Sequence, residues 1–187
     1  PRSSSAASDV YKRQAFNFIQ KKPIDIFCTE NVFDALKREF HYIFNPKFKY
    51  PGIPSINRTK IDKNNSFNVN EVKITPIEVM HYKLPVLGFR IKNLAYVTDA
   101  KTISNEELKK INGSKILVIN CLQINEHLSH LNLNEALDII EKIEVEKVFF
   151  THISHNLGLH MEINKRLPKN VKLAYDNLVL ELWVNYI

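Results

Sequence analysis

The sequence predicts an α/β fold in which mixed sheets are covered on the outside by helices. Four strand-like segments follow one another between residues 67 and 98, whereas strand-like and helix-like segments alternate from residue 104 onwards. Three apolar runs end on a residue that can bind a metal, namely His81, Asp99 and His152. A strand end holds such a side chain rigidly, so these three residues are candidate ligands of one site.

The composition is that of an ordinary globular domain. The chain has 187 residues, of which 44% are hydrophobic and 25% are charged, and this length is sufficient for one domain with a core. The sequence shows neither a secretory signal pattern nor an apolar run near the roughly 20 residues of a membrane helix. Cys28 and Cys121 both lie in apolar runs, so we expect two buried free thiols and a cytoplasmic location.

The formal net charge of +6 is spread along the chain. An anionic substrate would suit this charge, but the sequence has no dense basic run and no interleaved basic and aromatic motif. We therefore expect no binding to nucleic acid and none to a membrane.

Residues 1–14 differ from the rest of the chain. They are rich in Ser and Ala and have no apolar period, and protein-like patterning begins at Ala15. We expect a non-native leader here, such as translated adapter sequence, and the alternative is a native disordered tail. A single domain is accordingly expected over residues 15–187.

The first elements form a short α/β segment. Residues 23–28 are interpreted as a strand, and residues 31–44 as a helix capped by Thr29 or Glu30. Residues 45–65 contain three Pro and one Gly and are interpreted as a loop.

The remaining elements follow from apolar periodicity and capping residues. A tight hairpin is predicted at residues 91–94, a helix capped by Ser104 at Asn105–Ile111, and a helix capped by Asn132 or Asn134 that ends at Ile143. The predicted strands are residues 67–70, 72–80, 86–91, 94–98, 115–120, Val145–Thr151, 171–174 and 178–184, and a last short helix is predicted at residues 158–166.

Five stretches of the chain carry a family resemblance. They are V-M-H-Y-K-L-P-V-L-G-F-R-I at 79–91, L-A-Y-V-T-D-A at 94–100, K-I-L-V-I-N-C at 115–121, H-L-N-L-N-E-A-L at 130–137 and F-F-T-H-I-S-H at 149–155. In this order and spacing they resemble the metallo-β-lactamase-fold hydrolases, especially the phosphodiesterase branch that includes phosphoribosyl cyclic phosphodiesterase. The resemblance covers about residues 15–187 and implies an αββα sandwich.

The resemblance also implies roles for individual residues. His81 would bind one divalent metal (Zn²⁺ or Mn²⁺), His152 would bind a second, and Asp99 would bridge the two. Two such ions about 3.5–4 Å apart stabilise the charge that develops on a phosphoryl group. His130 matches the family position that gives a proton to the leaving oxygen, and His155 would contact the substrate or orient a ligand.

Simpler interpretations remain open for these residues. A strand-end Asp such as Asp99 can form a turn, and His130 or His155 can be an ordinary surface residue. The other histidines are interpreted as surface or structural residues, and they are His41, His127 and His160.

The sequence departs from the family pattern at two places. The family's main metal motif, H-x-H-x-D-H, would lie upstream of Ala15, and the sequence has no His before His41. We therefore expect the chain to lack the first strands and up to four ligands of its parent enzyme, and to be inactive by itself. Asn120 stands at a strand end where relatives often carry an acid.

The function expected for the parent is metal-dependent hydrolysis of a small phosphodiester. A tRNA 3′-processing endonuclease of the same fold is one alternative, and a non-catalytic family member that acts as a binding module is another. The expected partners are the small substrate and, for a homodimer, a second copy of the chain.

Overall fold

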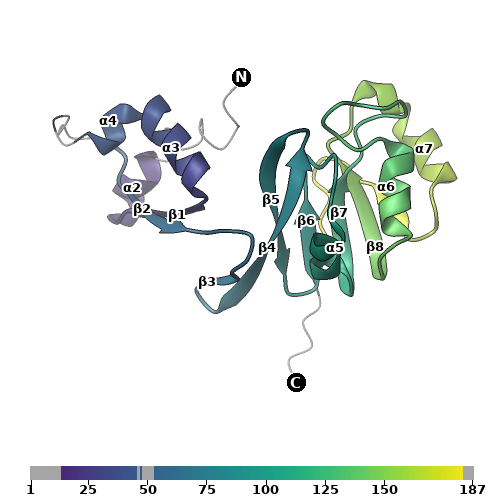
Figure 1. Ribbon diagram of the computed structural model, residues 1–187, viewed down its shortest axis with the longest axis horizontal. Helices are drawn as coiled ribbons and strands as arrows, with labels where there is room; N and C mark the ends of the chain where they lie inside the picture. Colours follow the sequence, from purple (N-terminus) through teal and green to yellow (C-terminus); the bar gives the residue numbers. More distant parts are fainter. Residues whose placement is uncertain (1–13, 46, 48–52, 183–187) are drawn as a thin grey trace. The chain divides into compact units, whose positions relative to one another are not determined.

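The computed structural model describes residues 14–45, 47 and 53–182 (Figure 1). The chain divides into two compact units, residues 1–62 and 63–187. No helix within the described ranges is long and apolar enough to cross a membrane. The predicted leader of residues 1–14 lies, apart from Gln14, outside the described residues.

The first unit contains a two-stranded parallel sheet and three helices, one before the first strand and two between the strands, among the described residues. Its elements are α2 (Gln14–Gln20), β1 (Ile24–Cys28), α3 (Glu30–Glu39), α4 (His41–Phe44) and β2 (Ile56–Lys60). Strand β1 is as predicted, and Thr29 caps α3 by accepting the N–H of Val32.

Two predictions for this unit are wrong. The helix does not continue through residue 44, because Phe40 leaves the helical region with φ −115° and ψ 43° and packs its side chain against Leu36. The predicted loop contains strand β2, in which Ile56 lies opposite Ile24 of β1. The mostly polar residues of β2 form a strand because they pair with β1, which lies far away in the sequence.

The second unit is built on a seven-stranded mixed sheet in the order β3-β4-β5-β6-β7-β8-β9. Its strands are β3 (Phe67–Val69), β4 (Val72–His81), β5 (Leu84–Ile91), β6 (Leu94–Val97), β7 (Ser114–Asn120), β8 (Val145–Thr151) and β9 (Val171–Leu173). Strands β3 to β6 pair in antiparallel fashion, and β6 to β9 pair in parallel. The hairpin predicted at residues 91–94 joins β5 to β6.

Helices connect the parallel strands. They are α5 (Asn105–Ile111), α6 (Leu133–Ile140), the 3-10 turn η1 (His155–Leu157) and α7 (His160–Arg166). Helix α5 has the predicted limits and the predicted cap at Ser104. Helix α6 ends at Ile140 rather than at residue 143, and α7 starts later than predicted because Gly158 has a φ of 110° that no helix allows.

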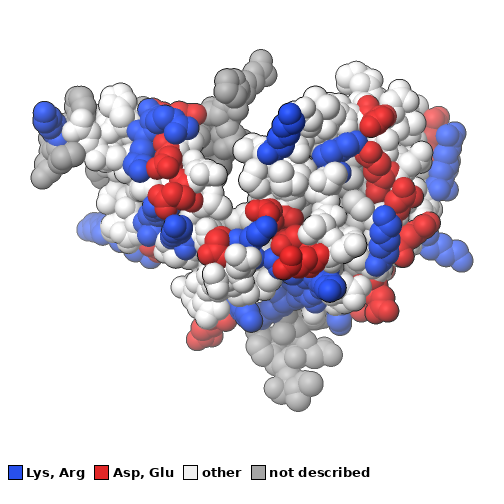
Figure 2. All heavy atoms as spheres, viewed as in Figure 1, with Lys and Arg blue, Asp and Glu red and all other residues white. Residues whose placement is uncertain are grey.

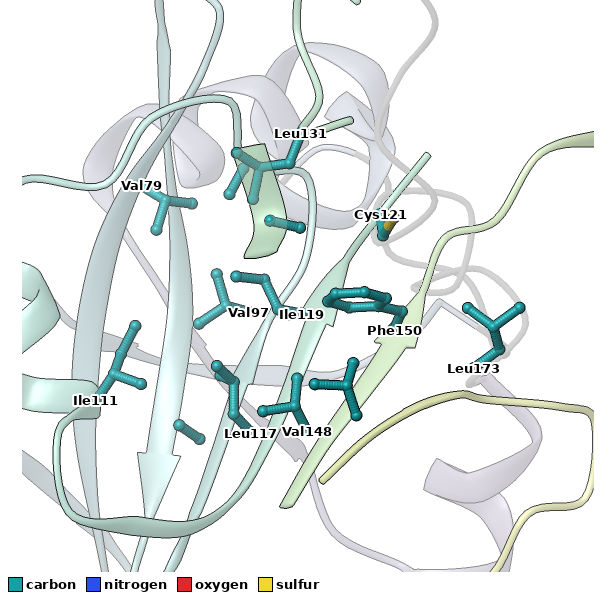
Figure 3. Packing of buried hydrophobic residues seen from close by; sticks show 14 of the residues in the cluster. Val79, Val97, Ile111, Leu117, Ile119, Cys121, Leu131, Val148, Phe150 and Leu173 are labelled. Atoms are coloured by element: carbon teal, nitrogen blue, oxygen red, sulfur yellow. The ribbon is translucent and has the colours of Figure 1, made fainter. Parts of the chain in front are cut away.

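Strands β7 and β8 are buried on both faces by apolar side chains that alternate along them. On one face Leu117 and Ile119 of β7 and Phe150 of β8 are fully buried in the main core (Figure 3). On the other face Ile116, Val118 and Phe149 pack against side chains of the last described segment, among them Leu178 and Leu180. The strand predicted at residues 178–184 is wrong for residues 178–182, and its last two residues lie outside the described part.

Candidate metal centre

The topology of the second unit brings three strand ends to one edge of the sheet. Strands β4 and β6 run in the same direction because each is antiparallel to β5, and β8 runs with them because β6, β7 and β8 are parallel. His81 is the last residue of β4, His152 comes directly after β8, and Asp99 comes two residues after the end of β6. The three predicted ligands therefore lie at the same edge. His130, in the loop before α6, joins them there.

The four side chains are in direct contact. Asp99 Oδ1 lies 3.2 Å from Nε2 of His130 and 3.7 Å from Nε2 of His152. The His130 ring is stacked on the His152 ring and meets the His81 ring edge-on, with centroid distances of 4.7 Å in both cases. One ligand atom from each of His81, Asp99 and His130 lies within 4.8 Å of the other two. The structure thus groups His81 and Asp99 with His130, while His152 contacts Asp99 and His130, and the predicted roles of these residues stay predictions.

The backbone at two of these positions adopts an uncommon conformation. Asp99 has a φ of 59° and His152 has a φ of 56°. Both values lie in the left-handed region, which residues other than glycine seldom adopt. Such a conformation costs free energy and persists where the surrounding structure imposes it. Here hydrogen bonds impose it. Ala100, next to Asp99, bonds with the side chain of Asn120, and the Thr151 carbonyl, next to His152, accepts the N–H of Cys121.

Burial separates His130 from the other members of the cluster. His130 is buried, whereas the side chains of Asp99 and His152 are 43% and 41% exposed. Burial lowers the pKa of His130, and the nearby His152 and His81 add to this, while the hydrogen bond to Asp99 acts in the opposite direction. The ring is thus held toward its neutral form, which is the form that binds a metal.

The residues present fit a divalent metal ion. Imidazole nitrogens together with one carboxylate are typical donors to Zn²⁺, and they also suit Mn²⁺ or Fe²⁺. The partly exposed side chains of Asp99 and His152 leave this side of the cluster open to solvent. His130, predicted as a proton donor, lies closer to Asp99 than His152 does, so its Nε2 is also placed to act as a ligand.

His155 is not brought into the cluster. It is exposed at the start of η1, and the described structure shows no side-chain contact between it and the four clustered residues. Its role near the substrate stays a prediction.

A residue that sequence reasoning missed is His127. The sequence predicts a surface residue here, whereas His127 is half-buried and its Nδ1 lies 3.3 Å from Nδ1 of His130. Ser129, between the two, has its hydroxyl 3.0 Å from the same nitrogen of His130. The signal that would have identified it is the H-L-S-H spacing, which places a second His three residues before a candidate site residue.

Comparison with known proteins agrees with this fold. The β-lactamase superfamily domain matches residues 9–153, and the chain therefore belongs to the β-lactamase superfamily. The crystal structure of a diphosphatase from the PhnP family superposes with a TM-score of 0.81 and is 28% identical, over 95% of this chain and 66% of that one. The predicted α/β fold with mixed sheets and helices is confirmed.

Two further relatives are similar over different extents. Zn²⁺-bound PqqB from Methylobacterium extorquens shares the fold, with a TM-score of 0.68 and 16% identity over 86% of this chain and 66% of that one. An octanoyltransferase of Porphyromonas gingivalis (strain ATCC BAA-308 / W83) is 32% identical over 158 residues, which are 84% of this chain and 32% of that protein. The chain thus spans about a third of the length of this curated relative.

Proposed function

We propose that this chain carries part of the active site of a metal-dependent hydrolase that cleaves a phosphodiester or diphosphate bond in a small substrate. The observation that carries the proposal is the contact of Asp99 with His130 and His152, beside His81, at one edge of the sheet. The similarity to a diphosphatase of the PhnP family supports the choice of a phosphorus-containing substrate.

The roles follow from the chemistry of the side chains. We assign His81, Asp99 and His152 as ligands of a divalent metal, Zn²⁺ or Mn²⁺, because each lies at or just after a strand end, His81 and Asp99 belong to one group of possible ligand atoms, and His152 lies 3.7 Å from Asp99. When bound, such an ion polarises a phosphoryl oxygen and offsets negative charge in the transition state. Asp99, with two oxygens, is the residue able to bridge two ions. His130 gives a proton to the leaving oxygen through its Nε2.

The charge distribution favours a small substrate over a nucleic acid. Figure 2 shows Lys and Arg side chains interspersed with Asp and Glu side chains on the face in view, without a continuous basic stripe. A nucleic-acid site usually needs such a stripe to neutralise several phosphates. On the face in view, the charge pattern therefore supports a small substrate better than a tRNA.

A complete two-metal site needs more donors than the cluster provides among the described residues. We propose that the remaining ligands belong to the whole protein and lie outside the described part of this chain. By itself the chain then binds one metal ion weakly and turns over little or no substrate. A cytoplasmic location and a homodimer stay predictions.

The test compares the 187-residue chain with the longer protein read from the gene upstream of Ala15. Zinc and manganese content and hydrolysis of bis-p-nitrophenyl phosphate are measured for both, with Asp99→Asn as the inactive variant and His160→Asn as the control. We expect activity in the longer protein that Asp99→Asn removes and His160→Asn retains. No turnover with any divalent metal would instead favour a non-catalytic binding module.

A further inference from the structure

Three hairpin turns of the second unit share one backbone feature. They are the two-residue turns at 70–71, 82–83 and 92–93, which join β3 to β4, β4 to β5 and β5 to β6. The first residue of each turn has a positive φ, which is 52° at Asn70, 57° at Tyr82 and 52° at Lys92. Hairpin positions with positive φ favour Gly or Asn, because a larger side chain is strained there. Asn70 follows this preference, whereas Tyr82 places a bulky ring at such a position.

The turn with the tyrosine is the one that lies beside the candidate metal centre. Strand β4 ends at His81, which pairs with Leu84 across the mouth of the hairpin, so Tyr82 directly follows a candidate ligand. The turns at 70–71 and 92–93 lie at the opposite edge of the sheet, because they precede β4 and follow β5. The strained aromatic residue is thus found where the cluster is.

The fold gains little from the ring of Tyr82. The residue is 49% exposed, so packing in a core does not offset the strain of its backbone. The ammonium group of Lys83 lies over the ring, 5.2 Å from its centroid, and such a cation–π contact is weak at an exposed site. Strained residues that the core does not require are found mostly at functional sites. Tyr82 is therefore a candidate for contact with a ligand.

Exposed apolar side chains adjoin the cluster on three segments of the chain. They are Leu84, opposite His81, Leu128, in the loop of His130, and Ile153, directly after His152. Small-molecule sites typically combine apolar surface with a few convergent polar groups. The surroundings of the cluster are therefore suited to a substrate with an apolar part as well as a charged one.

We propose that Tyr82 and Lys83 form a substrate-recognition element, and that the substrate is a phosphodiester or diphosphate that carries an aromatic ring. This inference rests on the proposed function, because it names the substrate class of the same site. The aromatic ring of the substrate stacks on the face of Tyr82 that Lys83 leaves free. The ammonium group of Lys83 adds a positive charge that attracts the phosphate.

The experiment compares two phosphodiesters of equal charge, diphenyl phosphate and dibutyl phosphate, of which only the first has aromatic rings. Their affinities for the 187-residue chain are measured in zinc-containing buffer by NMR titration. Tyr82→Phe keeps the ring, Tyr82→Asn introduces the residue that the turn prefers, and Lys83→Gln removes the charge. Tyr175→Asn is the matched control, because Tyr175 is also exposed, at 62%, and lies after β9.

The unaltered chain, Tyr82→Phe and Tyr175→Asn should bind diphenyl phosphate about two- to tenfold more tightly than dibutyl phosphate, as expected for one aromatic pair. Tyr82→Asn should remove this preference, and Lys83→Gln should weaken the binding of both diesters. Equal affinities for the two diesters in the unaltered chain, or an unchanged preference in Tyr82→Asn, would overturn the proposal. Unchanged affinities in Lys83→Gln would overturn the part assigned to Lys83.

Stability separates recognition from a structural role of the ring. Because Asn suits a positive φ, as at Asn70, the urea midpoint of Tyr82→Asn should equal or exceed that of the unaltered chain. Loss of diphenyl phosphate binding without loss of stability supports the proposal. A clearly lower midpoint would show that the ring serves the fold and would overturn it.

Kinetics of the longer protein read from the gene distinguish this inference from the proposed function. Tyr82→Asn should raise KM for bis-p-nitrophenyl phosphate and leave kcat unchanged, because stacking is equally strong before and during the reaction. If the longer protein is active and Tyr82→Asn changes neither constant, the proposed function stands and this inference fails. If no diester is hydrolysed but Tyr82→Asn abolishes the preference for diphenyl phosphate, the recognition element stands and the proposed function fails.

Discussion

The side chain of Asn120 holds the backbone of Ala100 by both of its polar groups. Its Oδ1 accepts the N–H of Ala100 at 2.8 Å, and its Nδ2 donates to the Ala100 carbonyl at 2.9 Å. Asn120 is fully buried at the end of β7, and Ala100 follows Asp99 directly. The amide thus fixes the strained turn that presents the Asp99 carboxylate. An acid at position 120 would lack the N–H donor that this arrangement uses.

We predict that Asn120→Asp destabilises the chain and weakens its metal site together. The carboxylate cannot donate to the Ala100 carbonyl, and a buried polar group left without its partner costs about 1–3 kcal/mol. Urea unfolding followed by circular dichroism measures the loss, and zinc calorimetry measures the effect on Asp99. Asn125→Asp, in an exposed loop position, is the matched control. Unchanged stability and zinc affinity in Asn120→Asp would show that Asn120 does not position Asp99.

The strand ends that carry the site are predictable from sequence for a simple reason. An apolar run closed by one ligand residue is visible in a single chain, and His81, Asp99 and His152 all follow this pattern. Strand direction then brings them to one edge. The pattern predicts strands β7 and β8 equally well, because burial on both faces requires the apolar runs at residues 116–119 and 148–150.

Other features depend on contacts that no local pattern reveals. The contact of Asn120 with Ala100 depends on a turn after another strand. The contact of His127 with His130 depends on the path of an irregular loop. Strand β2 depends on pairing with β1. The strand predicted at residues 178–184 is wrong for a related reason. The apolar side chains of Leu178 and Leu180 cover a face of the sheet, and their segment does not pair with the sheet as a further strand.

Zinc is predicted to stabilise the chain through the cluster around Asp99. A ligand present at about 100 times its dissociation constant adds about 2.7 kcal/mol of stability, which a thermal melt detects as a higher Tm. His ligands bind metal only when neutral, so the increase in Tm should be present at pH 8 and lost at pH 5, below the usual imidazole pKa of about 6.5. His81→Ala and Asp99→Asn should abolish the increase, and His160→Ala should retain it. An equal increase in all four proteins would mean that zinc binds elsewhere.

The two cysteines are predicted to be unreactive in the folded chain. Both are buried free thiols, and burial raises the pKa of Cys121 to about 12. Burial also raises the pKa of Cys28, although the neighbouring Arg58 acts in the opposite direction. Since the thiolate is the reactive form, alkylation at pH 7.5 should be slow at both sites and slowest at Cys121. Mass spectrometry after iodoacetamide treatment, with and without urea, measures this order. Faster labelling of Cys121 than of Cys28 in the native chain would contradict the assigned burial.

The ion pair between Glu30 and Arg58 predicts how the stability of the first unit depends on pH. Arg58 donates to both carboxylate oxygens of Glu30, at 3.1 and 2.8 Å, and this hydrogen bonding lowers the pKa of Glu30 to about 2. The group therefore binds a proton more readily in the unfolded chain, so its contribution is complete above pH 4.5 and is lost as the pH falls from there toward 2. Because the carboxylate is exposed to solvent, we expect a small effect. Urea midpoints of the unaltered chain and Glu30→Gln should differ at pH 6 and converge as the pH approaches 3. Glu71→Gln, at an exposed turn before β4, should show no such convergence, and a Glu30→Gln difference that grows in acid would contradict the role of this pair.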